Sequence, residues 1–141
     1  MTISLTDVRS GETFALADFR GRVVVVETMA VWCPLCLDQA REIRQANLRF
    51  GDEVAFVSLD VDVNESADLL REHATRNGLD WRWAVAPREL ARALADAFGM
   101  AILNPPSTPV VILDRAQQPH LLRFGIKPAS ELIQEIEAYL S

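Results

Sequence analysis

Residues 23–36 read VVVVETMAVWCPLC, and most of the predicted fold follows from them. Val23 to Val26 form an unbroken β-branched run, which is typical of a strand buried on both faces of a sheet. Beyond the cysteines that follow, apolar residues recur at the spacing of a helix. These apolar positions are Cys36, Ala40, Ile43 and Phe50. The stretch therefore predicts a central strand, a turn that carries two cysteines, and an amphipathic helix.

A second buried strand is predicted beyond the end of this helix. Gly51 is placed to stop the helix, and Val54 to Leu59 form another apolar run. Two buried strands joined by a helix make a β-α-β unit, which normally has a right-handed crossover and parallel strands. We therefore expect these two strands to lie parallel in one sheet.

The flanking segments predict that this sheet is mixed. A short strand within residues 13–16 leads to a turn at Gly21, and Asn64 is placed as the N-cap of a helix that ends at Asn77. The later elements are a strand over 81–86, a helix over 87–98, a hairpin of strands over 110–113 and 120–124, and a helix that Pro128 opens. Because a hairpin is antiparallel, the expected fold class is α/β, with a mixed central sheet and helices on both faces. We expect one domain over residues 1–141.

Composition excludes several classes of protein. Half of the 141 residues are hydrophobic, which argues against a disordered chain, and the formal charge of -6 argues against a nucleic-acid surface. No apolar run approaches the roughly 18 residues needed to span a bilayer. Met1 to Ser4 lack the basic start and apolar stretch of a secretory signal. We therefore expect either a cytoplasmic protein or the soluble part of an exported one.

Cys33 and Cys36 are the only cysteines, and their C-x-x-C spacing indicates redox chemistry. Cysteines three residues apart on a helical turn lie close enough to form a disulfide. Cys33 would lie at the helix N-terminus, where the helix dipole and free N–H groups favour a thiolate, so we expect it to be the nucleophile. Cys36 would lie one turn further on, more deeply buried, and would resolve the mixed disulfide. Pro34 suits the first turn because it has no N–H to leave unpaired.

The segment from Val26 to Cys36 resembles the active-site strand and turn of the thioredoxin superfamily. The earlier FALADFRGR, residues 14–22, and the later PSTPVVILD, residues 106–114, are similar to the TlpA/ResA-like branch, with its AhpC/TSA-redoxin type of domain. These matches run from about residue 11 to the C-terminus in the family's order. The resemblance implies a thioredoxin-like fold with an N-terminal strand extension and a helical insertion before the strand that follows Pro109.

The resemblance also implies roles for particular residues. Pro109 corresponds to a cis-proline beside the disulfide, so a cis Thr108–Pro109 bond is expected, with the preceding backbone free to pair with a bound peptide. Trp32 corresponds to the aromatic lid before the first cysteine, and Pro34 completes the substrate-binding set. Glu27 corresponds to a buried acid that moves the proton of the second cysteine. Its place within an apolar strand independently favours burial and a raised pKa.

The expected function is that of a thiol-disulfide oxidoreductase, more specifically a reductant of the TlpA/ResA type. Its partners would be proteins that supply a disulfide or a dithiol, together with an upstream electron donor. No organic cofactor, metal or nucleic acid is expected, and we expect a monomer. The family is typically exported and membrane-tethered, which implies an extracytoplasmic location.

The cysteines and the acids allow four other interpretations. A zinc site needs about four ligands and a second pair is missing, whereas a copper-handling module would need only the two thiols as its core. A thiol peroxidase is disfavoured because Ala30 stands where its T-x-x-C context requires threonine. Four acidic residues after the second strand could mark a cation site, but a solvated loop and helix start is the better reading. These acids are Asp60, Asp62, Glu65 and Asp68.

Overall fold

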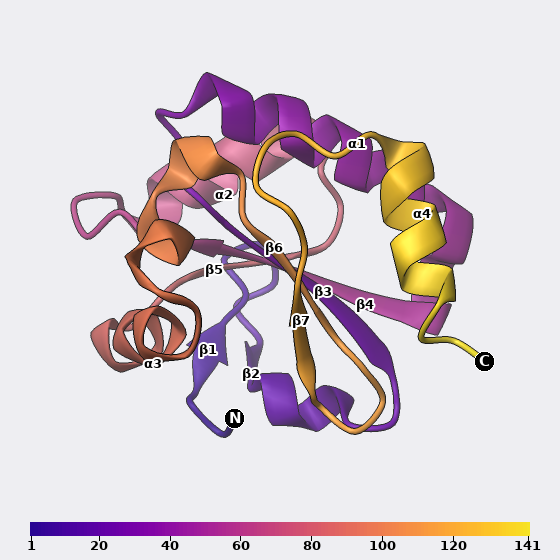
Figure 1. Cartoon of the computed structure of the whole chain (residues 1–141). Helices are drawn as coiled ribbons and strands as arrows, with labels where there is room; N and C mark the ends of the chain where they lie inside the picture. The colour runs from indigo at the N-terminus through magenta and orange to yellow at the C-terminus, as the bar shows by residue number, and fades with distance from the viewer.

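The computed structural model describes residues 1–141 and has a five-stranded central sheet in the order β5-β4-β3-β6-β7, flanked by helices (Figure 1). The strands are β1 (Leu5–Thr6), β2 (Thr13–Phe14), β3 (Val23–Met29), β4 (Val54–Asp60), β5 (Arg82–Val85), β6 (Val110–Leu113) and β7 (Pro119–Leu121). The α-helices are α1 (Pro34–Phe50), α2 (Ala67–Arg76), α3 (Arg88–Phe98) and α4 (Ala129–Glu137). Short 3-10 helices cover Leu16–Phe19, Gly51–Glu53, Met100–Leu103 and Pro105–Ser107.

The valine run forms the central strand, as predicted. β3 pairs in parallel with β4 and antiparallel with β6, so the expected mixed sheet and parallel β-α-β unit are confirmed. Every residue of β3 and β4 is buried, because helices cover one face of the sheet and α3 and the N-terminal segment cover the other. The α/β fold class with helices on both faces is therefore confirmed.

Alternation along β3 decides which side chains face the cysteine-bearing helix. Val23, Val25 and Met29 pack on the face covered by α1, α2 and α4, whereas Val24 and Val26 face α3. Side chains of a strand point to opposite faces in turn, so Glu27 shares the face of Val25 and Met29. The predicted proton-transfer residue is thereby directed towards the α1 layer of the molecule.

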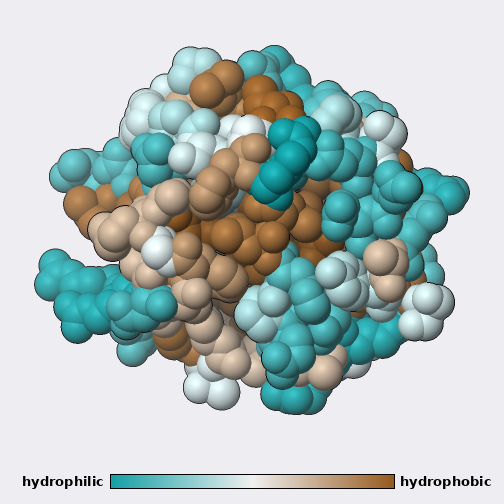
Figure 2. Space-filling model, in the orientation of Figure 1, coloured by the Kyte–Doolittle hydropathy of each residue, from teal (hydrophilic) through white to brown (hydrophobic).

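The opposite face of the sheet is only partly covered. A hollow of about 240 Å³ lies between α3 and the sheet, with Val26, Leu94, Phe98 and Val111 among its walls. Figure 2 shows apolar side chains gathered in the middle of the visible face of the molecule. None of the helices combines the length and apolar character needed to cross a lipid bilayer.

Some element boundaries differ from the sequence prediction. The second helix begins after Ser66 rather than Asn64, because the Ser66 hydroxyl accepts the Leu69 N–H at 3.1 Å, while Asn64 belongs to a turn closed by the Asp62 carboxylate. The first predicted strand shortens to β2 and continues as a 3-10 helix at Leu16–Phe19. The second strand of the hairpin is β7, which begins one residue earlier and ends three residues earlier than predicted.

The cis peptide bond predicted for Thr108–Pro109 is wrong: the chain contains no cis peptide bond. Thr108 instead adopts the left-handed conformation, with φ 46° and ψ 57°, directly after the 3-10 helix Pro105–Ser107. Its N–H donates to Pro105 O at 2.8 Å, and its carbonyl accepts the Lys127 ammonium at 2.7 Å. These two bonds hold a β-branched residue in a backbone region that such residues seldom occupy, and the chain turns into β6 from there.

Candidate active site

The two cysteines form a disulfide at the start of α1, with their Cα atoms 5.2 Å apart. The strand β3 delivers the chain to this turn, and Cys33 is the N-cap of α1, with Pro34 as its first residue. The Cys33 Sγ accepts the backbone N–H of Cys36 at 3.1 Å. A sulfur that receives an N–H at the positive end of a helix dipole is stabilised as a thiolate, which supports Cys33 as the nucleophile.

Burial does not distinguish the two cysteines, contrary to the sequence prediction. Both residues are 2% exposed. They differ in their polar neighbours, because the Cys36 Sγ faces a carbonyl oxygen, Pro105 O, at 3.2 Å. In the reduced protein a thiol can donate to this carbonyl, whereas a thiolate would be repelled by it. The surroundings thus favour a thiolate at Cys33 and a neutral thiol at Cys36.

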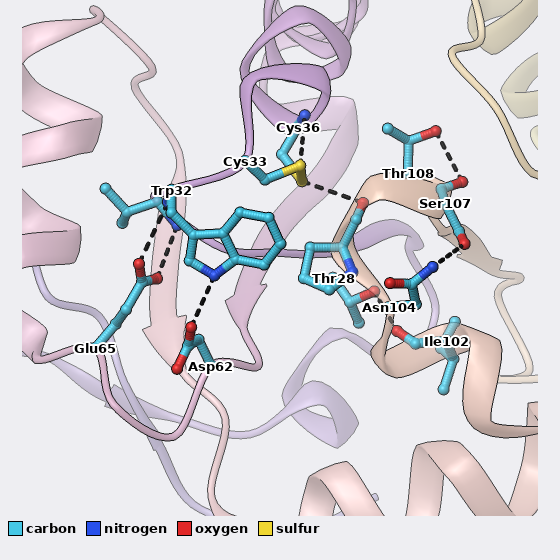
Figure 3. Close-up of a disulfide and its surroundings, with 12 residues drawn as sticks. Thr28, Trp32, Cys33, Cys36, Asp62, Glu65, Ile102, Asn104, Ser107 and Thr108 are labelled. Atoms are coloured by element: carbon cyan, nitrogen blue, oxygen red, sulfur yellow. Dashed lines mark hydrogen bonds between the residues drawn. A yellow bond between two sulfur atoms is a disulfide. The ribbon is translucent and has the colours of Figure 1, made fainter.

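Trp32 stands beside the disulfide with 54% of its surface exposed, held from below by two carboxylates (Figure 3). Its indole Nε1 donates to Asp62 Oδ2 at 2.7 Å. The Glu65 carboxylate accepts the backbone N–H groups of Val31 at 2.7 Å and Trp32 at 3.3 Å. Asp62 and Glu65 lie in the predicted loop before α2 and remain half-exposed, and both also bind the turn before the first cysteine.

The predicted solvated loop is wrong for Asp60, which is a buried carboxyl group at the end of β4. Its Oδ1 accepts the Asp62 N–H at 2.9 Å, and its Oδ2 has no hydrogen-bond partner. Burial, and next the neighbouring Glu65 side chain, raise the pKa of Asp60 well above its usual range. A neutral Asp60 can lie beneath the Trp32 turn without adding another negative charge to Asp62 and Glu65.

Glu27 is buried, with 3% of its surface exposed, and forms the end of a hydrogen-bonded chain. The Ser58 hydroxyl donates to Glu27 Oε1 at 2.6 Å and accepts the Trp81 indole N–H at 2.8 Å. Burial raises the pKa of Glu27 to about 7, although the Ser58 hydrogen bond and the positive charge of Lys127 act in the opposite direction. A carboxyl group with this pKa can accept and return a proton near neutral pH.

The remaining predicted substrate-binding residues differ in accessibility. Pro34 is exposed on the first turn of α1, next to Trp32. Thr108 and Pro109 are buried, and both backbone polar groups of Thr108 are occupied by Pro105 O and Lys127 Nζ. Pro109 O accepts the Thr28 N–H at 3.3 Å, which joins this segment to the end of β3. In this arrangement the Thr108 backbone is used within the chain.

Sequence reasoning missed Ser58, Trp81, Pro105 and Lys127. A serine inside the second buried strand was a signal, because a hydroxyl among apolar residues needs a buried partner. The single lysine of a chain whose other basic side chains are arginine and histidine was another. The contacts of Trp81 and Pro105 join segments far apart in the sequence, so no local pattern announces them.

No group of three or more His, Cys, Asp or Glu side chains is arranged to hold a metal ion. His120 lies 3.0 Å from Asp114 through its Nε2 and stacks on Tyr139 at 4.4 Å between ring centroids. The two thiols would therefore be the protein's contribution to a copper site, since copper favours soft sulfur ligands.

The sequence matches the family model described as Redoxin over residues 2–118. No protein of curated function matches the chain.

Solved structures share the whole fold at low sequence identity. One is a thiol:disulfide interchange protein, a thioredoxin family protein from Chlorobium tepidum TLS, with 19% identity and a TM-score of 0.81 over 99% of this chain and 94% of that chain. Another is a secreted Mycobacterium tuberculosis disulfide oxidoreductase homologous to E. coli DsbE, with 18% identity and a TM-score of 0.73 over 97% and 96%. A third is BsSco, a member of the Sco family of cytochrome c oxidase assembly proteins, with 15% identity and a TM-score of 0.79 over 100% and 92%.

Proposed function

Because the chain belongs to the redoxin family, with a thioredoxin-like fold and a C-x-x-C pair, we propose that it exchanges its Cys33–Cys36 dithiol with disulfides of partner proteins. The observation that carries this proposal is the unequal surroundings of the two sulfur atoms. Cys33 Sγ receives a backbone N–H, and Cys36 Sγ faces the Pro105 carbonyl. One cysteine is thus prepared to attack and the other to remain protonated until it is needed.

In the proposed reaction the reduced protein acts as the electron donor. The Cys33 thiolate attacks one sulfur of the partner's disulfide, which forms a mixed disulfide and releases the first partner sulfur as a thiolate that takes up a proton. Cys36 then loses its proton and attacks Cys33 Sγ, so the second partner sulfur leaves as a thiolate. The partner has gained two electrons, and the Cys33–Cys36 disulfide has formed. An upstream thiol donor returns the pair to the dithiol.

Glu27 is proposed as the base that receives the Cys36 proton. It lies on the face of β3 that is covered by α1, and its raised pKa keeps it able to exchange protons near neutral pH. Ser58 donates to Oε1 of the Glu27 carboxyl group, and Oε2 takes no part in this network. That oxygen is the proton acceptor in the proposal.

The partner would dock around the exposed side of the disulfide. Trp32 and Pro34 are accessible there, and a groove beside Trp32 is also lined by Val63, Leu103 and Pro105. Thr108 and Pro109 are proposed to shape the groove from beneath rather than through free backbone groups, because those groups are already hydrogen-bonded. Apolar walls with few polar groups suit an extended segment of a partner protein.

We also propose that the protein is a reductant that works outside the cytoplasm as a monomer. The resemblance of residues 14–22 and 106–114 to TlpA/ResA-like proteins supports this, as does the likeness to the secreted oxidoreductase from Mycobacterium tuberculosis. The equilibrium of the Cys33–Cys36 pair with glutathione tests the direction. A potential near that of thioredoxin supports a reductant, and a much higher one contradicts it.

Trapping of the mixed disulfide tests the exchange itself. Reduced wild-type protein is expected to reduce insulin or another disulfide-containing protein, and Cys36→Ser to accumulate a covalent complex through Cys33 that dithiothreitol releases. Cys33→Ser is expected to form no such complex and serves as the matched control. If the wild-type protein leaves every disulfide substrate intact under these conditions, the proposed exchange is wrong.

Copper handling by the two thiols is the second candidate, favoured by the fold that the chain shares with BsSco. Cu(I) titration of the reduced protein separates the two functions, with stoichiometry read from thiolate-to-copper absorption. Tight binding of one copper ion that Cys33→Ser abolishes, in a protein inactive towards disulfides, would favour the copper function. Disulfide exchange without tight binding of copper would exclude it.

A further inference from the structure

Lys127 is the only lysine of the chain, and its side chain is completely buried. Its Nζ donates to three backbone carbonyl oxygens, those of Thr108 at 2.7 Å, Arg123 at 3.0 Å and Gly125 at 2.6 Å. An ammonium group has three donors and no acceptor, so these carbonyls satisfy it fully. Lys127 takes part in none of the ion pairs of the chain, so its positive charge has no carboxylate in direct contact.

The backbone of Lys127 is fastened to the helix that carries the cysteines. Gln39 lies on α1 one turn beyond Cys36 and is 1% exposed. Its amide accepts the Lys127 N–H at 2.9 Å and donates to the Lys127 carbonyl at 3.0 Å. The backbone of Lys127 therefore binds α1, and its side chain binds the turn at Thr108.

The Thr108 turn in turn reaches the disulfide. Thr108 N–H donates to Pro105 O, the same carbonyl that faces Cys36 Sγ at 3.2 Å. Two hydrogen bonds thus connect the Lys127 ammonium to the carbonyl that faces Cys36. The first joins Lys127 Nζ to Thr108 O, and the second joins Thr108 N–H to Pro105 O. Removal of the ammonium would leave three carbonyls without a donor and would free a residue held in the left-handed conformation.

The charges of Lys127 and Glu27 influence each other's pKa: the ammonium lowers the pKa of Glu27, and the carboxylate raises the pKa of Lys127. Besides burial, which lowers it most, the pKa of Lys127 is lowered by Arg123 in the loop after β7 and raised by Glu131 on α4. Arg123 and Glu131 form a bidentate ion pair, which largely cancels their effects, while Gln39 from α1 is neutral. Glu42 of α1 accepts the Ala129 N–H at 2.9 Å. Glu27 is therefore the one buried carboxyl group whose ionised form the ammonium can stabilise.

We propose that Lys127 is a positioning residue for thiol-disulfide exchange: its buried ammonium fastens the Thr108 turn beside Cys36, and its charge stabilises the ionised carboxylate of Glu27. This inference rests on the proposed exchange reaction. Glu27 loses its negative charge when it accepts the Cys36 proton and regains that charge when it releases the proton, all within a buried site. A fixed buried cation makes the charged state of Glu27 accessible without a move of the helix.

Because the chain has one lysine, the coupling can be measured in the wild-type protein. Selective 13C-lysine labelling gives a single side-chain ε-carbon signal, whose pH titration reports Lys127; burial lowers the pKa of this group to about 8. In Glu27→Gln the midpoint is expected to fall by about half a unit to one unit, because the stabilising carboxylate is gone. In Glu42→Gln, the matched control on α1, it is expected to stay at its wild-type value. An unchanged midpoint in Glu27→Gln overturns the coupling.

The reciprocal experiment uses Lys127→Met, which keeps the length of the side chain, and Lys127→Gln, which keeps a donor without the charge. The carboxyl-carbon titration of Glu27, assigned by its loss in Glu27→Gln, is expected to move to higher pH by a similar amount in both variants. Gln39→Met removes the hydrogen bonds between α1 and the Lys127 backbone but keeps the Lys127 charge. It should therefore leave the Glu27 midpoint unchanged. An equal shift in Gln39→Met means that Lys127 acts only through structure, and the charge role is then wrong.

Activity distinguishes a failure of this inference from a failure of the proposed function. In reduced protein the rate of Cys33 alkylation by iodoacetamide is measured against pH for the wild type and Lys127→Gln. If Lys127 positions the site, the variant's profile shifts and its insulin reduction falls by about tenfold or more. If the wild type is active and Lys127→Gln has the same pH profile of Cys33 alkylation, only this inference is contradicted. A wild type inactive towards disulfides, with intact lysine coupling, contradicts the proposed exchange and, with it, the role of Lys127 in that exchange.

Discussion

The carbonyl oxygen of Pro105 lies 3.2 Å from Cys36 Sγ, although 69 positions separate the two residues in the sequence. The same carbonyl accepts the Thr108 N–H, and the Thr108 carbonyl accepts the Lys127 ammonium. A carbonyl dipole that points its negative end at a sulfur atom disfavours the thiolate there. The second cysteine is therefore controlled by a segment that lies far from the C-x-x-C turn in the chain.

Glu27→Gln is expected to change how stability depends on pH. The carboxyl group has a pKa of about 7 in the folded protein and 4.5 as its model value, a difference worth about 3 kcal/mol. The folded state holds the proton more tightly, so this contribution is complete below pH 4.5 and is lost as the pH rises through 7. Urea denaturation is expected to show equal stability of the variant and the wild type at pH 4, and a more stable variant at pH 8. A gain of equal size at both pH values would contradict the assignment.

Ser58→Ala is expected to raise the pKa of Glu27 further, because the hydroxyl that stabilises the ionised carboxylate is removed. The Trp81 indole also loses its acceptor, which costs about 1–3 kcal/mol of stability. Carboxyl-carbon NMR titration and urea denaturation measure the two effects. Thr28→Val is the matched control, since its buried hydroxyl donates to Ile102 O and not to Glu27. A control that moved the Glu27 midpoint as far would remove the specific role of Ser58.

Glu65→Ala is expected to loosen the turn before Cys33. The variant leaves the Val31 and Trp32 N–H groups without their carboxylate acceptor, at a cost of about 1–2 kcal/mol. The fluorescence of Trp32, the exposed tryptophan, should become more accessible to acrylamide. Glu72→Ala removes a carboxylate from an exposed pair with Arg76 and should cost no more than about 0.5 kcal/mol. Equal losses of stability in Glu65→Ala and Glu72→Ala would show that the Glu65 hydrogen bonds do not stabilise the turn.

Trp83→Ala is expected to be among the most destabilising single changes. Trp83 lies on β5 with its side chain fully buried, and its ring contacts His73 of α2 at 6.0 Å and stacks on Trp81 at 5.4 Å between ring centroids. Its indole N–H donates to Leu79 O at 3.0 Å. Loss of a buried aromatic ring costs about 3–5 kcal/mol. Thermal and urea denaturation measure it, with Leu48→Ala at an exposed position of α1 as the control. A loss below about 1 kcal/mol would mean that the core around Trp83 is not packed as described.

Much of the fold could be predicted because its signals are local. The valine run reflects side-chain burial on both faces of one strand, and the helical spacing after Cys33 reflects burial of one face of a helix. Gly51 marks the helix end because glycine readily adopts the positive φ found there. The boundary at Ser66 was missed, because Asn64 and Ser66 are both suitable caps and the Asp62 turn uses the first. The cis bond at Pro109 was expected from the family resemblance and not from a local pattern, and the chain does not have it.

The C-x-x-C pair at the start of a helix, and a carboxyl group on the strand before it, could be located from the amino-acid sequence alone. Periodicity is a property of neighbouring residues, so no coordinates were needed for either. Their surroundings are known only from the folded chain: the Ser58 hydroxyl binds Glu27, the Pro105 carbonyl faces Cys36, and the single lysine binds Thr108. The reason is that burial and hydrogen bonding between distant segments set the charge of a group, and those contacts exist only once the segments have packed together.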